Sequence, residues 1–286
     1  MFVPHVPNLG KVFLIGAGPG AADLITLRGA RLLARADIVF HDALVDPEML
    51  DLCPQAIRVP VGKRCGKLSS AQHFINKRLI DAALQYKTVV RLKGGDPMIF
   101  GRADEEIQAL KDREIQVEVV PGITAALAGA ASIQQSLTLR GVSRSVAFVT
   151  VAQSQDPNTE IPSPSEHLPL EQPNADTLVY YMGRKDAVKI AKQLIEASAR
   201  HSRDTPVHIL EAVSTKSERH WSSTLGLLAD GHANDWLNIS SPALIMVGEA
   251  LREREEVFSP DLNRSCSERN DSLQDGLILS NSRHCA

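Results

Sequence analysis

The chain has 286 residues, of which 43% are hydrophobic, and its formal net charge is −3 at pH 7. This length and composition suit one large domain or two medium ones, each with its own core. The slightly acidic balance argues against nucleic acid or an anionic membrane surface as the main partner. No apolar run reaches the roughly 18 residues of a membrane span, and residues 1–10 lack the pattern of a signal peptide. We therefore expect a soluble, cytoplasmic, globular protein.

Predicted strands and helices alternate along the first 135 residues. Runs rich in β-branched residues predict strands at 11–15, 37–41, 57–61, 88–92 and 116–120. Helical patterns lie between them at 27–35, 70–85 and 102–113. This alternation predicts an open α/β sheet with substantial parallel pairing.

A proline-rich stretch at 153–175 has no hydrophobic periodicity and predicts a long loop. Alternation then resumes, with strands expected at 177–182, 207–213 and 243–247 and a helix at 185–198. The segment 148–152 is expected to end a further strand. The expected organisation is an N-terminal α/β domain at 10–123, a C-terminal α/β domain at 124–255 and a disordered polar tail at 256–286.

Three predicted strand ends carry unusual turns, which read GAGPG at 16–20, GGDP at 94–97 and PGITA at 121–125. Ligands of open α/β sheets bind outside the carboxyl ends of the strands. Gly and Pro also punctuate ordinary turns, but three such turns at successive strand ends favour a common role. We expect them to rim one ligand cleft.

The first turn also satisfies the dinucleotide-binding pattern, with small residues at its three key positions and an acid, Asp37, further along. Two features argue against that function. Pro19 removes a backbone donor, and the helix is expected to begin only after Thr26, an N-cap residue. A pyrophosphate would then have no helix N-terminus beneath it. A ligand without phosphates, held by backbone amides and the Asp96 carboxylate, fits better.

Five segments together resemble one family. They read VFLIGAGPGAADLITLRG, DIVFHDALV, VGKRCG, VVRLKGGDPMIFGRADEE and VVPGITAALAGAAS. From about residue 10 to residue 251 the chain resembles the uroporphyrinogen-III C-methyltransferases, which are S-adenosylmethionine-dependent tetrapyrrole methylases. The resemblance implies two α/β domains with open mixed sheets, a cofactor cleft between them, and a homodimer. It further implies methylation of uroporphyrinogen III at carbons 2 and 7 to precorrin-2, in the sirohaem, cobalamin or haem d1 branch.

The resemblance implies a set of cofactor contacts in the turns and in the second half of the chain. They are Pro19, Gly94, Gly95, Asp96, Ile99, Thr124, Ala125, Met182 and Val213. Val213 stands where the family has Gly or Ala, and its side chain is expected to crowd the adenine edge. Met182, taken alone, reads as an ordinary buried strand residue.

Four further residues match the family's acid–base and substrate-binding positions: Asp42, Lys63, Arg102 and Glu105. Arg102 is implied to bind a substrate carboxylate or assist proton removal, with Glu105 orienting it at helical i, i+3 spacing. The alternatives are a strand-end cap for Asp42, a surface lysine for Lys63, and a helix-surface ion pair for Arg102 with Glu105. No nucleophilic Ser or Cys is implied.

The implied substrate carries eight carboxylates, which need local cations. Those near the predicted strand ends are Arg28, Lys63, Arg64, Lys67, Lys93, Arg102, Arg140 and Arg144. About half of them are expected to face the cleft and the rest to be solvated.

One region departs from the family pattern. LTLRG at 137–141 and FVTVA at 148–152 stand where the family has sequences like LTHRD and VTGH. This departure leaves open a different tetrapyrrole substrate, a slower enzyme, or a relative that only binds tetrapyrroles. A dinucleotide-dependent oxidoreductase built on the first turn is the remaining alternative. The cysteines Cys53, Cys65, Cys266 and Cys285 lack metal-site spacing, so no metal is expected.

Overall fold

A computed structural model describes residues 9–61, 68–151, 173–197, 199–238 and 240–253 of the chain. It contains two five-stranded sheets, which both belong to one compact unit, Met1–Arg252. The α/β class and the two sheets expected from the sequence are confirmed, while the exact domain limits stay a prediction. Every helix among the described residues is too short or too polar to cross a membrane.

The first sheet is parallel throughout, in the order β3-β2-β4-β1-β5. Its strands are β1 (Lys11–Gly16), β2 (Ile38–His41), β3 (Ile57–Pro60), β4 (Thr88–Lys93) and β5 (Val117–Val120). The connecting helices are α1 (Leu27–Leu33), α2 (Pro47–Leu50), α3 (Leu68–Ala83) and α4 (Ala103–Lys111). A parallel sheet needs such crossovers, and they cover both of its faces.

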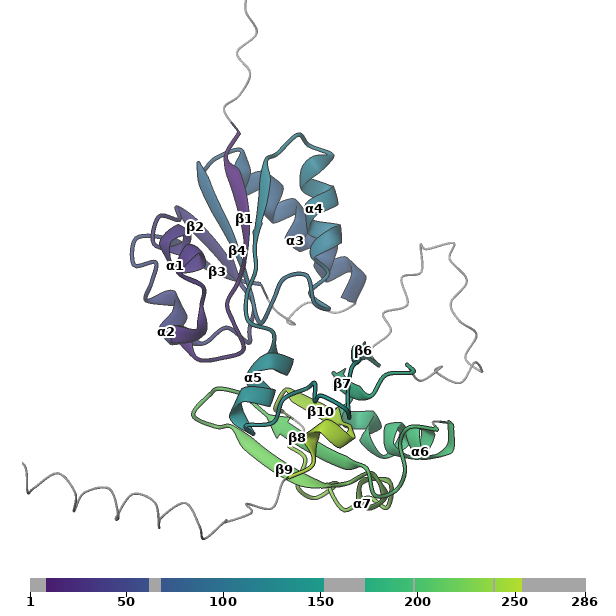
Figure 1. Ribbon diagram of the computed structural model, residues 1–286. Helices are drawn as coiled ribbons and strands as arrows, with labels where there is room; N and C mark the ends of the chain where they lie inside the picture. Colours follow the sequence, from purple (N-terminus) through teal and green to yellow (C-terminus); the bar gives the residue numbers. More distant parts are fainter. Residues whose placement is uncertain (1–8, 62–67, 152–172, 198, 239, 254–286) are drawn as a thin grey trace, which may run out of the picture. The chain divides into compact units, whose positions relative to one another are not determined.

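The strands of the first sheet alternate their side chains between two cores. On β1, Val12 and Leu14 belong to the core that contains Leu79 of α3 and Leu110 of α4. Phe13 and Ile15 belong to the core under α1 and α2. Figure 1 shows the two helix pairs on opposite faces of this sheet. Burial on both faces explains why the predicted strands read as continuous apolar runs rather than as alternating patterns.

The second sheet is mixed, in the order β6-β7-β10-β8-β9. Its strands are β6 (Val146–Thr150), β7 (Thr177–Tyr181), β8 (Pro206–Glu211), β9 (Arg219–Thr224) and β10 (Ala243–Val247). Only the β6–β7 pair is parallel, and β10 runs antiparallel to both β7 and β8. Consequently β6, β7 and β8 run in the same direction and end at the same edge of the sheet.

Three helices accompany the second sheet: α5 (Ala125–Ser132), α6 (Ala187–Ala197) and α7 (Leu225–Ala229). Apolar residues of α6 and α7, including Ile190 and Leu228, form one core with the sheet. The alanines of α5 pack in a separate core with Leu210 and Met246. Short 3-10 helices lie at η1 (Ala22–Leu24), η2 (Arg184–Asp186) and η3 (Glu249–Leu251).

The predicted elements are found, with differences at their ends that have physical causes. The strand expected at 177–182 stops at Tyr181, because Met182 has a left-handed φ of 57°. The strand expected at 207–213 stops at Glu211, because Ala212 has a φ of 49°. β9 was not predicted, since its sequence RHWSST is polar and its side chains are largely exposed at the sheet edge.

Candidate ligand site at the glycine turns

The three glycine-containing turns follow neighbouring strands, because β4, β1 and β5 are adjacent in the first sheet. Gly18 and Gly95 exchange two backbone hydrogen bonds, of 3.2 Å from Gly18 N and 2.7 Å from Gly95 N. Ala17 N also donates to Lys93 O at 2.7 Å. The turns expected from the sequence to lie together therefore do so.

Backbone packing explains Gly122 but not Gly94 in these turns. A Cβ on Gly122 would stand 2.3 Å from Gly95 O and 2.8 Å from Gly16 Cα, distances that real Cβ atoms do not show. A Cβ on Gly94, by contrast, would meet nothing closer than Leu44 Cβ at 3.8 Å. Packing within the chain therefore does not require glycine at position 94. Open space beside the Gly94 backbone is what close approach by a ligand needs.

Asp96 ties two of the turns together. Its Oδ1 accepts a hydrogen bond from Met98 N at 2.8 Å, and its Oδ2 accepts one from Gly122 N at 2.9 Å. A carboxylate can accept about four hydrogen bonds, so capacity for a ligand remains. Asp96 thus has a structural role in addition to the ligand contact that the sequence predicts.

The dinucleotide interpretation of the first turn does not agree with the structure. The turn is followed by η1, and α1 begins at Leu27 with Thr26 as its N-cap, where Gly29 N donates to Thr26 Oγ1 at 3.1 Å. Asp37 precedes β2, so it lies at the amino end of the strand, where its Oδ2 accepts Thr88 N at 2.8 Å. A ribose-binding acid belongs near the carboxyl ends.

Tyr181, at the end of β7, joins the second sheet to the PGITA turn. Its hydroxyl lies 2.6 Å from Thr124 Oγ1 and accepts a hydrogen bond from Ala126 N at 3.1 Å. Its ring makes an edge contact with that of Phe100, whose centroid is 5.1 Å away. Burial, with a smaller contribution from the negative charge of Asp96, raises the pKa of Tyr181. The sequence analysis missed this residue; its signal was a tyrosine at a predicted strand end.

Several non-glycine residues with left-handed backbone conformations fall in the segments that the resemblance assigns to the site. They are Phe100, Arg102, Met182, Ala212 and Ser214, with φ between 49° and 62°. Such conformations cost about 1–3 kcal/mol each and gather at functional sites. Their positions therefore support these segments as parts of a functional site, independently of the sequence motifs.

Met182 and Val213 differ from what the sequence suggests for each. Met182 follows β7 and is 53% exposed, so its interpretation as an ordinary buried residue is wrong. Val213 is buried among the residues that pack with α5. Its carbonyl oxygen lies 2.8 Å from where a Cβ on Gly20 would stand, and Ala21 N donates to Ser214 Oγ at 3.0 Å. The first turn therefore packs directly against the segment after β8.

Of the predicted acid–base residues, Asp42 follows β2 and Arg102 precedes α4. Arg91 Nη2 donates to Asp42 Oδ1 at 2.5 Å, and the Asp42 side chain is 31% exposed. Arg102 and Glu105 form a two-bond ion pair, with distances of 2.6 and 2.7 Å, and both are partly exposed. The predicted i, i+3 pairing is confirmed. Lys63 lies outside the described residues.

A buried charge network lies next to Asp42. Arg91 and Lys93, at alternate positions of β4, both contact Glu106 of α4, with Arg91 Nε and Lys93 Nζ each 3.1 Å from Glu106 Oε1. Glu106 is fully buried, and it also accepts a hydrogen bond from Gln72 at 3.2 Å. Burial, and then the charge of Arg91, lowers the pKa of Lys93. Lys93 was expected to be a cleft-facing or solvated cation, and the structure corrects this to a buried ion-pair member.

The other predicted cations have mixed surroundings. Arg28 is paired with Glu118, which also contacts Lys11, and Arg140 and Arg144 are exposed. Lys63, Arg64 and Lys67 lie outside the described residues. Within the described ranges, no group of three or more His, Cys, Asp or Glu side chains is placed to hold a metal ion.

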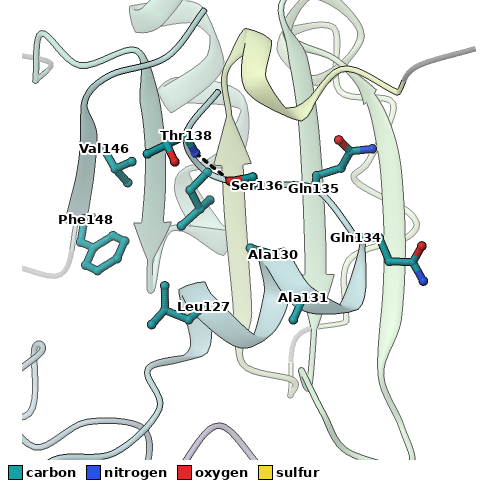
Figure 2. A pocket seen from close by; sticks show the side chains of 10 residues that line it. Leu127, Ala130, Ala131, Gln134, Gln135, Ser136, Thr138, Val146 and Phe148 are labelled. Atoms are coloured by element: carbon teal, nitrogen blue, oxygen red, sulfur yellow. Dashed lines mark hydrogen bonds between the residues drawn. The ribbon is translucent and has the colours of Figure 1, made fainter. Parts of the chain in front are cut away.

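A cavity of about 600 Å³ is partly lined by Leu137, Thr138 and Phe148, which belong to the two segments that depart from the family pattern. It is lined by α5, by the loop after it, and by β6: Leu127, Ala130, Ala131, Gln134, Gln135, Ser136, Leu137, Thr138, Val146 and Phe148. Figure 2 shows Phe148 and Val146 on β6, with Phe148 turned toward Leu127. The Phe148 ring also makes an edge contact with Tyr181, at 6.0 Å between centroids. LTLRG and FVTVA therefore meet at one cavity beside Tyr181.

Comparison with known proteins gives this geometry a family. The profile of the Tetrapyrrole (Corrin/Porphyrin) Methylases matches residues 11–229. A protein named Uroporphyrinogen-III C-methyltransferase from Pseudomonas aeruginosa is 43% identical over 245 residues, which are 85% of this chain and 95% of that one. A Siroheme synthase from Psychrobacter sp. is 42% identical over 87% of this chain, which spans only 50% of that relative's length.

Solved structures agree with the sequence relatives. The native uroporphyrin III C-methyl transferase from Thermus thermophilus matches with a TM-score of 0.70 and 35% identity, covering 85% of this chain and 94% of that one. A structure from the same organism, described as complexed with S-adenyl homocysteine, matches with a TM-score of 0.69 and 34% identity over the same shares. The glycine turns, the two sheets and these matches together establish that the chain belongs to the tetrapyrrole (corrin/porphyrin) methylases.

Proposed function

We propose that this chain transfers methyl groups from S-adenosylmethionine to carbons 2 and 7 of uroporphyrinogen III, giving precorrin-2. The single observation that carries the proposal is the open backbone at Gly94 beside Asp96, in a cluster of turns where Gly16 and Gly122 leave no room for a Cβ. This chain covers nearly the whole length of two relatives that have this activity in their names: 95% of the protein from Pseudomonas aeruginosa and 97% of the protein from Methanocaldococcus jannaschii. The Siroheme synthases among the relatives favour the sirohaem branch.

The residues present fit a methyl donor that has an amine, a carboxylate, hydroxyls and an adenine but no phosphate. The turns offer backbone groups, and the first of them is followed by the short 3-10 helix η1 rather than by the N-terminus of an α-helix. Exposed Met182 and Phe100 offer apolar contact. The proposed cofactor contacts remain Pro19, Gly94, Gly95, Asp96, Ile99, Thr124, Ala125, Met182 and Val213. Since the Val213 side chain is buried, we assign its contact to the backbone.

The proposed chemistry asks the protein mainly to align two reactants and to remove a proton. A pyrrole carbon attacks the methyl carbon of the sulfonium, the carbon–sulfur bond breaks, and its electron pair stays on sulfur, giving S-adenosylhomocysteine. The methylated tetrapyrrole then loses a proton. Alignment alone accounts for much of such a barrier, and an acid–base group contributes further. Asp42, Arg102, Glu105 and Lys63 are the proposed groups for proton transfer and for binding the substrate carboxylates.

A homodimer is also part of the proposal. Leu127, which lines the cavity of Figure 2, is 53% exposed, and Val142 in the following loop is 47% exposed. A contiguous exposed apolar patch marks an interaction surface, and we propose that this region forms one against a second copy. Sedimentation analysis of the full chain should give twice the monomer mass, and a monomer at working concentrations would contradict this part of the proposal.

A second candidate function rests on the same cavity. Because LTLRG and FVTVA both line or adjoin it, the chain is a candidate for a methylase of a different tetrapyrrole or for a binding protein without turnover. Val151, which follows β6, occupies the position of the family's glycine, and Ala152 lies outside the described residues. The family's VTGH sequence has a histidine at the position of Ala152, and its loss removes a group able to move a proton.

One anaerobic experiment tests these functions. The full chain is incubated with uroporphyrinogen III and S-adenosylmethionine, and the products are followed by mass. Gain of two methyl groups supports the proposal, whereas tetrapyrrole binding without mass change supports the second candidate. Calorimetric titrations with S-adenosylhomocysteine and NAD give the parallel binding result. Heat with NAD alone would overturn both functions.

A further inference from the structure

The guanidinium of Arg91 is held on several sides within the first sheet. Its Nε donates to Glu106 Oε1 at 3.1 Å, its Nη1 donates to Leu92 O at 3.2 Å, and its Nη2 donates to Asp42 Oδ1 at 2.5 Å. The Arg91 side chain is only 3% exposed. A planar donor group with partners in three directions has one orientation, so the position of its Nη2 is fixed.

Glu106 is the centre of this arrangement. It is fully buried, and both of its oxygens lie 3.1 Å from Lys93 Nζ while Oε1 also receives Arg91. Two buried cations therefore share one buried carboxylate. The second carboxylate that balances them is Asp42, the only member of the set with substantial exposure.

Stability is a poor explanation for such a network. Taking each charge out of water costs several kcal/mol, and apolar replacements of similar shape are often at least as stable. What the network does provide is geometry, because every buried member is oriented by another and the chain of contacts ends at a partly exposed carboxylate. Within the described part of the chain, Asp42 Oδ1 is the oxygen engaged by Arg91, and no described group bonds Oδ2.

We propose that Arg91 is a positioning residue that holds the Asp42 carboxylate by Oδ1 and leaves Oδ2 directed to the tetrapyrrole. This inference rests on the proposed methyl transfer, in which Asp42 is an acid–base group. Glu106 and Lys93 act one step further back by fixing Arg91. Glu106 also follows Glu105 in α4, so the same network anchors the turn that carries the Arg102–Glu105 pair.

The competing explanation is that Arg91 only ties β4 to α4. A double-mutant cycle separates the two, because a residue that acts through Asp42 has nothing left to act on once Asp42 is changed. The variants are Arg91→Lys, Asp42→Asn and the double change, in the full chain. Arg91→Lys keeps the charge but loses the fixed fork.

We expect Arg91→Lys to lower kcat roughly ten- to a hundredfold, with KM and S-adenosylhomocysteine affinity within about twofold of the natural values. The double variant should be no slower than Asp42→Asn alone. Arg219→Lys is the matched control, since Arg219 pairs with the fully buried Glu211 on the second sheet at 3.2 Å, and it should keep the natural kcat. If the two rate losses multiply in the double variant, or if KM rises and S-adenosylhomocysteine affinity falls together with kcat, the inference is overturned.

Two further measurements keep the test decisive. If Arg91→Lys does not fold, Glu106→Gln takes its place in the cycle, with a smaller rate loss that should again vanish in the Asp42→Asn background. If the natural chain does not methylate uroporphyrinogen III, the proposed function fails separately. Crystal structures of the natural chain and of Arg91→Lys then decide the geometry. An Asp42 carboxylate in the same orientation in both would overturn the positioning role, and a displaced or multiply oriented one would support it.

Discussion

The two sheets contribute to the candidate site by different physical means. The first sheet provides backbone, in three glycine-containing turns after the adjacent parallel strands β4, β1 and β5, together with the charged side chains of Asp42, Asp96 and Arg102. The second sheet provides side chains and left-handed residues after β7 and β8, which run in the same direction on either side of β10. In each sheet, strands that run in one direction bring their carboxyl ends to one edge. The difference is therefore in which chemical groups are presented there.

This difference predicts different responses to mutation. Turns that pack backbone on backbone tolerate no added atom, whereas side-chain contacts lose only the groups that are removed. Tightly packed positions in the first sheet's turns, such as Gly122, should therefore govern folding, whereas open positions there and the strand-end residues of the second sheet should govern affinity. The following changes test that contrast, starting from the largest effect.

The largest effect is expected for Gly122→Ala compared with Gly94→Ala. A Cβ at 122 would stand 2.3 Å from a carbonyl oxygen, and no rotation of a side chain relieves that contact. We expect Gly122→Ala to lower the free energy of unfolding by about 3 kcal/mol or more, as measured by urea denaturation. Gly94→Ala should change it by less than about 1 kcal/mol while weakening S-adenosylhomocysteine binding. Equal stability losses would show that position 94 is constrained by packing after all.

Asp96→Ala should affect both properties. The change removes the acceptor of two backbone N–H groups and, in the proposed function, one hydrogen bond to the ligand. A hydrogen bond to a charged group is worth about 1.5–3 kcal/mol, which corresponds to about a tenfold or larger loss of S-adenosylhomocysteine affinity. Calorimetry on a variant shown to be folded measures this. Asp96→Asn retains one acceptor oxygen, so its affinity should lie between those of the natural chain and Asp96→Ala. Unchanged affinity in folded Asp96→Ala would rule out the ligand contact.

Tyr181→Phe is expected to have a smaller effect from the second sheet. It removes the hydroxyl between Thr124 and Ala126 N but keeps the ring beside Phe100. A neutral hydrogen bond contributes about 1 kcal/mol, and this one holds Thr124, a proposed cofactor contact, so affinity for S-adenosylhomocysteine should fall by at most about fivefold. Thr124→Val removes the same bond from its other end. The double variant should therefore be little worse than either single one, and fully additive losses would mean that Tyr181 and Thr124 act independently.

The first sheet's part of the site could be predicted from the sequence because glycine turns and helix caps have local sequence patterns. GAGPG, GGDP and PGITA stand out by composition, and Thr26 was predicted as the N-cap that it is. Neither signal needs knowledge of distant residues. The i, i+3 pairing of Arg102 with Glu105 is equally local, and it too was confirmed.

The rest depended on contacts between residues far apart in the chain. Tyr181 contacts Thr124, which lies 57 positions away in the chain, and no local sequence pattern around either residue predicts this pair. Lys93 was read as a surface cation because lysine is rarely buried, and only the fold brings Glu106 to it. Met182 looked like core because its left-handed conformation, which turns the chain out of β7, has no sequence signal at a methionine.

The smallest effect is expected far from the glycine turns, at Asp176 before β7. Its carboxylate accepts hydrogen bonds from Arg144 N, from Ser145 and from Arg200, and the first of these does most to lower its pKa from 3.8 to about 2. A carboxyl whose pKa is lower in the folded chain stabilises that state fully above pH 3.8, and its contribution disappears as the pH falls toward 2. Asp176→Asn should therefore slightly lower the melting temperature near neutral pH and reduce its drop between pH 4 and 2. Affinity for S-adenosylhomocysteine should not change.

Thermal unfolding followed by circular dichroism from pH 2 to 7 measures the change in melting temperature. Parallel curves for the two proteins would show that Asp176 has the same pKa in the folded and the unfolded chain. A loss of ligand affinity in this variant would instead show that folding contacts of the second sheet, and not only its strand-end residues, control binding.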